Sequence, residues 1–243
     1  MVDPAGIRAV VFDMGGVFLI PHPDPIAETL AAAGVDHVPS AEEVHRAHYR
    51  GVRAITDLLA SRDAVDELDP DVWGHYDRGY YGALGLDEEG VAAASAARGR
   101  QRRSGAGGVW RHVLADNVAA FARIARRFAV AIVSNNDGTA AAQCAEHGIA
   151  QVGPGPHTPV VAIVDSTEVG VAKPDPRIFR PALEALAVEP GEALYVGDTV
   201  HADVEGARAA GMPVVQLDPY GLHADHDHWR TPDVVALADA LGA

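Results

Sequence analysis

The chain has 243 residues, of which 48% are hydrophobic and 22% charged, and its formal net charge is −15. This is the composition of a globular protein, long enough for one large domain or for a core with a modest second domain. So negative a chain is not expected to bind nucleic acid or an anionic membrane surface.

Cysteine content and hydropathy favour a cytoplasmic protein. Cys144 is the only cysteine, which rules out an internal disulfide, so a reducing compartment is the natural setting. The first residues lack the pattern of a secretory signal, and the longest apolar runs are strand-sized, too short to span a bilayer. We expect a soluble, cytoplasmic monomer or homodimer.

Short apolar runs alternate with amphipathic segments along most of the chain. β-Branched runs flanked by turn residues predict buried strands at 9–12, 129–133, 160–164, 193–196 and 213–217. Helical periodicity predicts helices at 113–127, 139–147, 176–187, 201–210 and 233–241. Such alternation builds a parallel sheet covered on both faces, so the predicted fold is α/β with a Rossmann-like core.

One stretch, from about 21 to 108, interrupts this alternation. It holds helical patterns near 40–59, 71–81 and 87–100 but no convincing strand, and Ser40 with Glu43 forms a capping-box signature. The Gly- and Arg-rich segment 98–108 is interpreted as a solvated return linker, in preference to an anion-binding segment. We therefore expect a core of residues 1–20 and 109–243 and a helical cap of residues 21–108, inserted after the first core strand.

Polar residues of defined type follow four of the predicted strands. Asp13 follows the first, Ser134-Asn135 the second and Gly197-Asp198 the fourth, with Asp203 shortly after, while Lys173 lies in the loop after the third. Each of these alone is an ordinary turn or cap residue. Ligands of open parallel sheets bind beyond the carboxyl ends of the strands. The combination therefore predicts one shared site.

Lys173 is the only lysine, because the other 18 of the 19 basic residues are arginine. A compact ammonium and a planar guanidinium do not replace each other freely in a tight site. A surface lysine retained by chance is the ordinary alternative. A cluster of Asp13, Asp198 and Asp203 would repel itself without cations, so we expect Lys173 and a metal ion to neutralise it.

The residue types suit phosphoryl transfer. Asp13 is placed to act as a carboxylate nucleophile that forms an aspartyl-phosphate. Asp198 and Asp203, with Asp13, offer the hard oxygen ligands that Mg²⁺ prefers. The Ser134 hydroxyl and nearby backbone N–H groups, including that of Asn135, can bind phosphoryl oxygens.

With these motifs the chain resembles a haloacid dehalogenase-superfamily hydrolase over essentially its whole length. Asp13 matches the first motif, Ser134 the second, Lys173 the third, and Gly197-Asp198 with Asp203 the fourth. The insertion lies where subfamily I members carry a helical C1 cap. The resemblance implies a Mg²⁺-dependent phosphohydrolase for small phosphorylated metabolites. It does not name the substrate.

Gly15 departs from the family's usual pattern. Phosphatases of the family usually carry a second aspartate there, two residues after the nucleophile, which acts as general acid and base. A glycine leaves only a backbone carbonyl, which can still reach Mg²⁺ beside the substrate. General acid–base catalysis is typically worth ~10²–10⁴-fold, so poor leaving groups should suffer most. His22 and Asp24 could lend a proton, but ordinary loop roles at the cap hinge are favoured.

Two alternative functions stay open. A 2-haloacid-type dehalogenase would use Asp13 to attack carbon, but that reaction needs no metal, and the complete pair of Asp198 and Asp203 counts against it. A catalytically weak sensor of a phosphorylated ligand is suggested by Gly15. The retained Asp13 and Lys173 count against the sensor.

Several other residues have ordinary interpretations. The segment 223–228 has the residue types of a transition-metal site, yet an exposed polar loop is favoured. His201 either orients the nearby aspartates or simply starts a helix. Cys144 is expected in the core. The aromatic residues Trp73, Tyr76, Tyr80 and Tyr81 could line the substrate entry, but packing within the helical insertion is the default.

Overall fold

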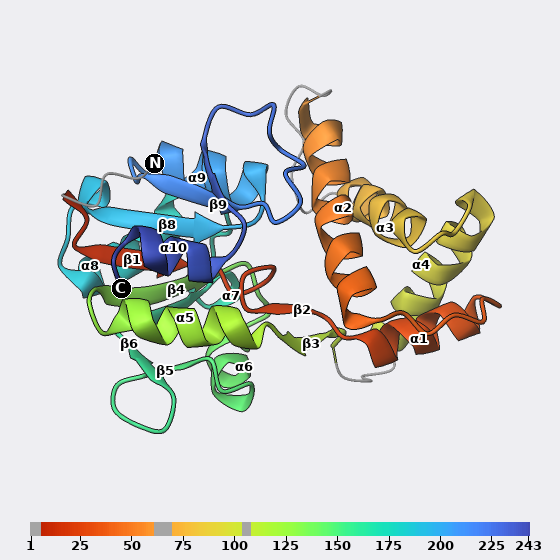
Figure 1. Ribbon diagram of the computed structural model, residues 1–243, viewed down its shortest axis with the longest axis horizontal. Coiled ribbons are helices and arrows are strands. Elements are labelled where there is room, and N and C mark those ends of the chain that lie inside the picture. Colours follow the sequence, from red (N-terminus) through yellow and green to blue (C-terminus); the bar gives the residue numbers. More distant parts are fainter. Residues whose placement is uncertain (1–5, 61–69, 104–107) are drawn as a thin grey trace. The chain divides into compact units, whose positions relative to one another are not determined.

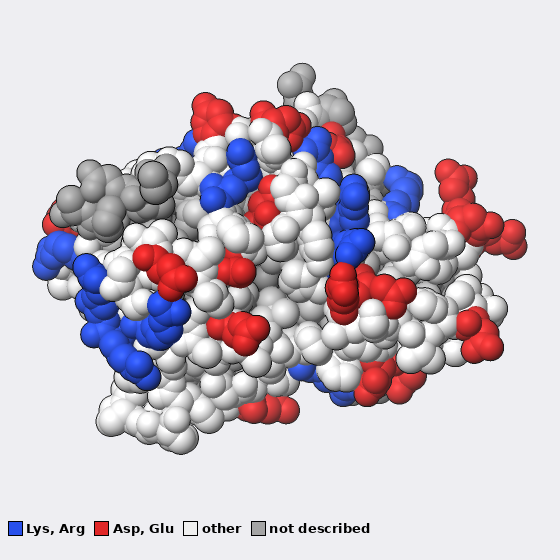
Figure 2. Space-filling model, in the orientation of Figure 1, with Lys and Arg blue, Asp and Glu red and all other residues white. Residues whose placement is uncertain are grey.

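The computed structural model describes residues 6–60, 70–103 and 108–243. The chain divides into two compact units (Figure 1). The first unit contains Met1–Phe18 and Val113–Ala243, and the second contains Leu19–His112. In the part of the chain that is described, no helix is both long and apolar enough to cross a lipid bilayer. On the face drawn in Figure 2, acidic and basic side chains are interspersed.

A six-stranded parallel sheet organises the first unit, in the order β10-β9-β8-β1-β4-β7. Its strands are β1 (Ala9–Phe12), β4 (Ala129–Ser134), β7 (Ala162–Asp165), β8 (Ala193–Gly197), β9 (Val214–Leu217) and β10 (Trp229–Thr231). Strands buried on both faces read as continuous apolar runs, which is why four of them were recognisable in the sequence. The predicted α/β class with a parallel Rossmann-like sheet is confirmed.

Helices and short strands connect these strands. They are α5 (Ala115–Ala125), α6 (Ala140–Glu146), β5 (Ala150–Val152), β6 (Thr158–Val160), α7 (Ser166–Val169), η2 (Pro176–Phe179), α8 (Arg180–Leu186), η3 (Pro190–Glu192), the π-helix η4 (Val200–Glu205), α9 (Gly206–Ala209) and α10 (Val234–Ala240). The strand predicted at 160–164 is wrong as a single element. The chain leaves the β5–β6 ladder at Val160 and enters the main sheet at Ala162.

Alternate side chains of β1 pack into two hydrophobic layers. Ala9 and Val11 belong to a buried cluster with Phe179 of η2 and with residues of α8 and α9. On the opposite face, the Phe12 ring meets the Phe121 ring of α5 edge-on, with the centroids 5.1 Å apart. Successive strand side chains point to opposite faces, so helices cover the sheet on both sides (Figure 1).

The second unit is mainly helical. Its elements are β2 (Leu19–Pro21), α1 (Pro23–Ala32), α2 (Ala41–Ala60), α3 (Pro70–Ala83) and α4 (Glu88–Arg103), and β2 pairs with β3 (Trp110–Val113) in a two-stranded sheet. The capping box at the start of α2 is present, because the Glu43 carboxylate accepts from the Ser40 N–H at 2.8 Å and the Ser40 hydroxyl accepts from the Glu43 N–H at 3.2 Å. The β2–β3 pair was not expected from the sequence.

Small residues and aromatic side chains hold α2 against α3. A Cβ at Gly51 would lie 2.7 Å from the Tyr76 ring, so this crossing requires glycine. Tyr76 stacks on Tyr80 at a centroid distance of 5.6 Å, and Tyr80 meets Tyr81 at 5.2 Å. All three tyrosines are buried, whereas Trp73 is 46% exposed. The tyrosines therefore pack inside the unit, as the sequence suggested.

The predicted return linker at 98–108 is wrong in its first part. Helix α4 continues to Arg103, and residues 104–107 lie outside the described ranges. Arg98 is not solvated linker, because its Nη1 lies 2.9 Å from the Oδ1 of the buried Asp77 and its guanidinium lies over the Tyr76 ring. Arginine is a good helix former, and this buried ion pair favours the helical continuation over an irregular segment.

Candidate active site

Three adjacent strands carry the predicted motifs to one edge of the sheet. β1 lies between β4 and β8, with Phe12 in register with Ile132 on one side and with Val196 on the other. The strand order reverses at β1, since β4 and β7 continue on one side and β8, β9 and β10 on the other. Asp13 therefore follows the strand at the topological switch point, where ligands of such sheets bind.

The acidic residues of the first and fourth motifs meet at this edge. Asp13, Asp198 and Asp203 offer carboxylate oxygens that all lie within 4.8 Å of one another. Among the described residues, this is the one such group of three or more potential metal ligands. All three side chains are buried. Ser134, at the end of the neighbouring strand β4, is also buried.

Lys173 lies among these carboxylates. Its Nζ is 2.9 Å from Asp13 Oδ1 and 2.8 Å from Asp203 Oδ1, and it donates to the Tyr195 hydroxyl at 3.0 Å. Burial alone would lower the pKa of Lys173, but Asp13 and Asp203 together raise it above its ordinary value. The ammonium is therefore permanently charged, and it is held between two acids.

Asn135 holds the loop that carries this lysine. Its amide nitrogen donates to the Lys173 carbonyl at 3.0 Å, and its amide oxygen accepts from the Lys173 N–H at 2.7 Å. Both ends of the amide thus bind the backbone of one residue. The side chain of Asn135 thus links the loop after β4 to the lysine. The expected binding of substrate by Asn135, through its backbone N–H, stays a prediction.

Asp203 anchors several groups at once. Its Oδ1 accepts from Lys173 and from the Tyr195 hydroxyl. Its Oδ2 accepts from the N–H groups of Asp198 and Thr199, at 3.1 and 2.9 Å, and from the Thr199 hydroxyl at 2.7 Å. Burial works to raise the pKa of Asp203, but Lys173 and these hydrogen bonds hold it below its ordinary value. Asp203 is therefore an ionised anchor inside the protein.

Local backbone geometry explains how these acids come so close. The predicted helix at 201–210 begins as the π-helix η4, and such wide turns are frequent at functional sites. A Cβ at Gly197 would lie 2.3 Å from the Asp203 carboxyl carbon, and one at Gly16 would lie 2.2 Å from an Asp198 oxygen. Gly16 also has φ +69°, which favours glycine. The glycines therefore make room for the carboxylates.

The charge of the cluster suits a divalent cation. Burial raises the pKa of Asp13 to about 7, Lys173 opposes that rise, and Asp203 and Asp198 add to it. Three carboxylates facing one ammonium leave an excess of negative charge. Hard carboxylate oxygens in this number are the donor set that Mg²⁺ binds. The residues present therefore fit the expected metal, which would also keep Asp13 ionised as a nucleophile must be.

Three histidines singled out in the sequence have identifiable contacts of their own. His201 Nδ1 lies 2.7 Å from Glu205 Oε2 on the same helical turn, which fits the plain helix-start interpretation. His22 caps α1, its Nδ1 accepting from the Asp24 N–H at 3.2 Å. The 223–228 segment was expected to be exposed, and this is wrong for His223, which is fully buried because it packs against polar groups beneath the loop.

Cys144 is a core residue, as expected. It is fully buried, its Sγ lies 3.5 Å from the Met14 Sδ, and burial raises the pKa of its thiol to about 12. The thiol is therefore unreactive at neutral pH.

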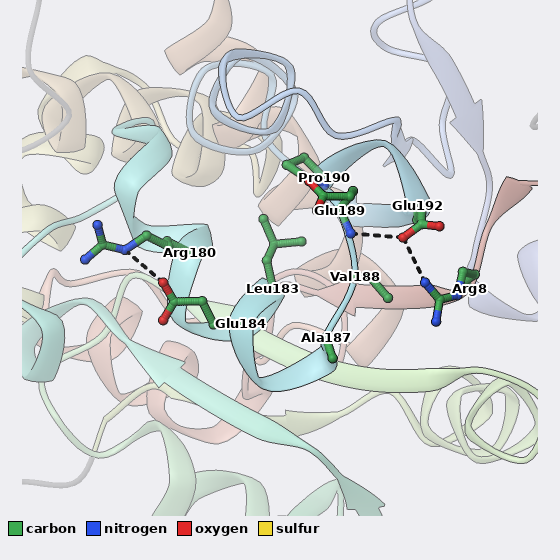
Figure 3. Close-up of a pocket in the computed structure, with 9 residues that line it drawn as sticks. All are labelled: Arg8, Arg180, Leu183, Glu184, Ala187, Val188, Glu189, Pro190 and Glu192. Atoms are coloured by element: carbon green, nitrogen blue, oxygen red, sulfur yellow. Dashed lines mark hydrogen bonds and ion pairs between the residues drawn. The ribbon is translucent and has the colours of Figure 1, made fainter.

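A surface hollow lies at the other end of the sheet. Figure 3 shows its lining, which includes Arg8, just before β1, and Glu192, just before β8. These are the amino ends of the strands, whereas Asp13 and Asp198 follow the carboxyl ends. Two ion pairs lie in its lining, Arg8 with Glu192 at 3.0 Å and Arg180 with Glu184 at 3.4 Å. The hollow therefore lies at the opposite end of the sheet from the acidic cluster.

An α/β fold with an acidic cluster and one buried lysine at the switch point defines a hydrolytic enzyme of the kind that the sequence motifs resemble. The chain belongs to the haloacid dehalogenase-like hydrolase family, whose model matches residues 7–211.

Curated relatives match parts of the chain. A phosphoserine phosphatase of Thermus thermophilus is 46% identical over 86 residues, which cover 32% of this chain and 34% of that protein. A glyceraldehyde 3-phosphate phosphatase of Methanopyrus kandleri is 49% identical over 55 residues, covering 23% and 24%. The chain thus matches about a quarter to a third of the length of these relatives.

Solved structures match it along nearly its whole length. A phosphatase of the same superfamily from Thermococcus onnurineus has a TM-score of 0.55 at 21% identity, covering 97% of this chain and 98% of the other. The L-2-haloacid dehalogenase of Xanthobacter autotrophicus has a TM-score of 0.54 at 19% identity, covering 98% and 99%. Phosphatases and dehalogenases are both among these neighbours, so the likeness establishes the fold and not the reaction.

Proposed function

We propose that the protein is a Mg²⁺-dependent phosphohydrolase that acts on small phosphorylated metabolites through an aspartyl-phosphate on Asp13. The observation that carries the proposal is the buried cluster in which Asp13 lies against the only lysine and beside Asp198 and Asp203. The partial matches to two phosphatases support the same chemistry. Dehalogenation needs no metal, so the complete pair of Asp198 and Asp203 counts against a dehalogenase.

The reaction would have two balanced steps. A carboxylate oxygen of Asp13 forms a bond to phosphorus while the bond from phosphorus to the leaving-group oxygen breaks. Water then attacks that phosphorus and loses a proton, the Asp13 oxygen leaves, and inorganic phosphate is released with the carboxylate restored. The solvent takes up that proton and supplies one to the leaving-group oxygen. Lys173 holds one oxygen of Asp13, which orients the other.

The remaining residues would stabilise charge. Bound Mg²⁺ would be held by Asp13, Asp198 and the Gly15 carbonyl, within the acidic cluster that Asp203 completes, and would supply positive charge to the phosphoryl oxygens. The Ser134 hydroxyl and the adjacent Asn135 N–H are assigned to those oxygens. Asp203, through its contacts to the Asp198 backbone and to Lys173, keeps both in place.

A metal-dependence experiment tests this function. A panel of phosphorylated metabolites and 4-nitrophenyl phosphate is assayed for phosphate release with Mg²⁺ and with excess chelator. We expect turnover that chelation abolishes and that Asp13→Asn, which keeps the volume of the side chain, also abolishes in a folded protein. Chelator-resistant halide release from a 2-haloacid would instead establish the dehalogenase, and tight binding of phosphate esters without single-turnover cleavage would establish the sensor.

A further inference from the structure

A buried glutamine lies directly behind the fourth motif. Gln216 is the polar member of the otherwise apolar strand β9, it is fully buried, and it is in register with Gly197 of β8. Its amide nitrogen donates to the backbone carbonyl of Asp198 at 2.8 Å. Burying an amide costs free energy unless its hydrogen bonds are satisfied, so the partners of the Gln216 amide indicate its role.

Two histidines of the 223–228 loop orient this amide. His228 Nε2 lies 2.6 Å from the Gln216 amide oxygen, which can only accept, so that nitrogen carries the proton. The Gln216 nitrogen also lies 3.3 Å from His223 Nδ1, which must therefore accept. Burial, and then Arg230, lower the pKa of His228 to about 4, so the ring is neutral and its donor stays in place. The amide can face only one way.

The backbone of Asp198 is consequently held on both sides. Its N–H donates to Asp203 at 3.1 Å, and its carbonyl accepts from Gln216 at 2.8 Å. Its carboxylate packs where a side chain at Gly16 would otherwise be. The first restraint comes from the acidic cluster, whereas the second comes from a different strand and from the histidine loop.

We propose that Gln216, oriented by His223 and His228, is a positioning residue that fixes Asp198 for metal binding. The inference rests on the proposed function, because it assigns Asp198 to Mg²⁺. Removing a residue that orients a metal ligand without binding the metal itself typically lowers metal affinity by about 10–100-fold. The loop that has the residue types of a metal site thereby serves the acidic cluster through one amide.

The test measures Mg²⁺ binding directly, by calorimetric titration of the unliganded protein, together with thermal unfolding without metal. Gln216→Leu removes the donor at similar volume and should weaken Mg²⁺ binding about 10-fold or more. Gln151→Leu is the matched control. Gln151 is also a glutamine on a strand, but its amide hydrogen-bonds to the local backbone of Gly153 and His157, in the segment between β5 and β6. Its loss should leave Mg²⁺ affinity unchanged.

A second variant keeps the test decisive if Gln216→Leu does not fold. His228→Phe leaves Gln216 in place and removes only the donor to its oxygen, so Mg²⁺ affinity should fall by a smaller factor. Wild-type affinity in His228→Phe, or in a folded Gln216→Leu, overturns the positioning role. A wild-type protein that binds no Mg²⁺ overturns the proposed function itself, and the inference with it.

Discussion

The ammonium of Lys173 lies 2.9 Å from the carboxylate of Asp13, and both side chains are nearly closed to solvent. A buried ion pair of this kind adds little to stability in general, because desolvation offsets the attraction. Its value here is geometric. The lysine fixes one oxygen of the carboxylate that follows the central strand.

Lys173→Arg should therefore not be conservative. The ammonium pairs with Asp13 and donates to Asp203 and Tyr195 from a single point, whereas a guanidinium is a wide planar fork. We expect kcat to fall at least about 10-fold, the equivalent of one misplaced interaction of about 1.4 kcal/mol. Steady-state kinetics at saturating Mg²⁺, with circular dichroism to confirm folding, provide the measurement. Near-native turnover would mean that positive charge alone matters.

Substituting the two aspartates of the fourth motif should have different effects, mainly on stability for Asp203 and mainly on metal binding for Asp198. Asp203→Asn places an amide nitrogen against N–H donors and leaves Lys173 with one buried acid fewer, so the free energy of unfolding should fall by about 3–5 kcal/mol. Asp198→Asn should cost less stability but weaken Mg²⁺ binding. Urea unfolding without metal measures the first effect and titration calorimetry the second. Equal stability losses in the two variants would contradict this division.

Gly15 should make hydrolysis depend steeply on the leaving group. No carboxylate side chain at that position can protonate a departing alkoxide, whereas an aryl oxide leaves without a proton. We expect kcat/KM for 4-nitrophenyl phosphate to exceed that for glycerol phosphate by far. Gly15→Asp should narrow the gap by raising the alkyl rate. A wild-type ratio near one would mean that another side chain supplies the proton.

Acid should destabilise the protein through two partly buried histidines. Burial and neighbouring charges lower the pKa values of His45 and His228 from 6.5 to about 4. Above pH 6.5 these rings are neutral whether the chain is folded or not. Between pH 6.5 and 4 these histidines are protonated in the unfolded chain but not in the folded chain. The free energy of unfolding therefore decreases as the pH is lowered. His45→Gln should flatten that slope in urea unfolding between pH 7 and 4.5, and an unchanged slope would show that His45 does not contribute.

Much of the core was predictable because its strands are continuous apolar runs that end in polar residues. The main elements and the convergence of Asp13, Lys173, Asp198 and Asp203 follow from that pattern and from the rule for strand ends. The hydrogen bonds made by polar side chains within the strands were not predictable from the sequence. Gln216 and Tyr195 sit in runs that read as hydrophobic core, and period and composition give no sign of their hydrogen bonds.

The helical insertion was predictable in kind and less so in detail. Its helices follow from periodicity, but Arg98 looked like part of a solvated linker because glycine and arginine dominate that segment. Its partner Asp77 is 21 positions away in the sequence, and only tertiary structure brings the two together. Outside the insertion, the burial of His223 could not be predicted either, because it depends on contacts with the polar groups beneath its loop.

The central position of β1 in the sheet predicts when activity is lost during thermal unfolding. β1 forms backbone pairs with β4 and with β8, so neither of its edges is open. Amide protons of such a strand exchange with solvent only when a large part of the molecule opens, whereas frayed ends and surface loops open on their own. Asp13 follows this strand directly. Asp13, the proposed nucleophile, should thus be among the last residues to lose its geometry on heating, and activity should be lost together with the protection of the most slowly exchanging amides.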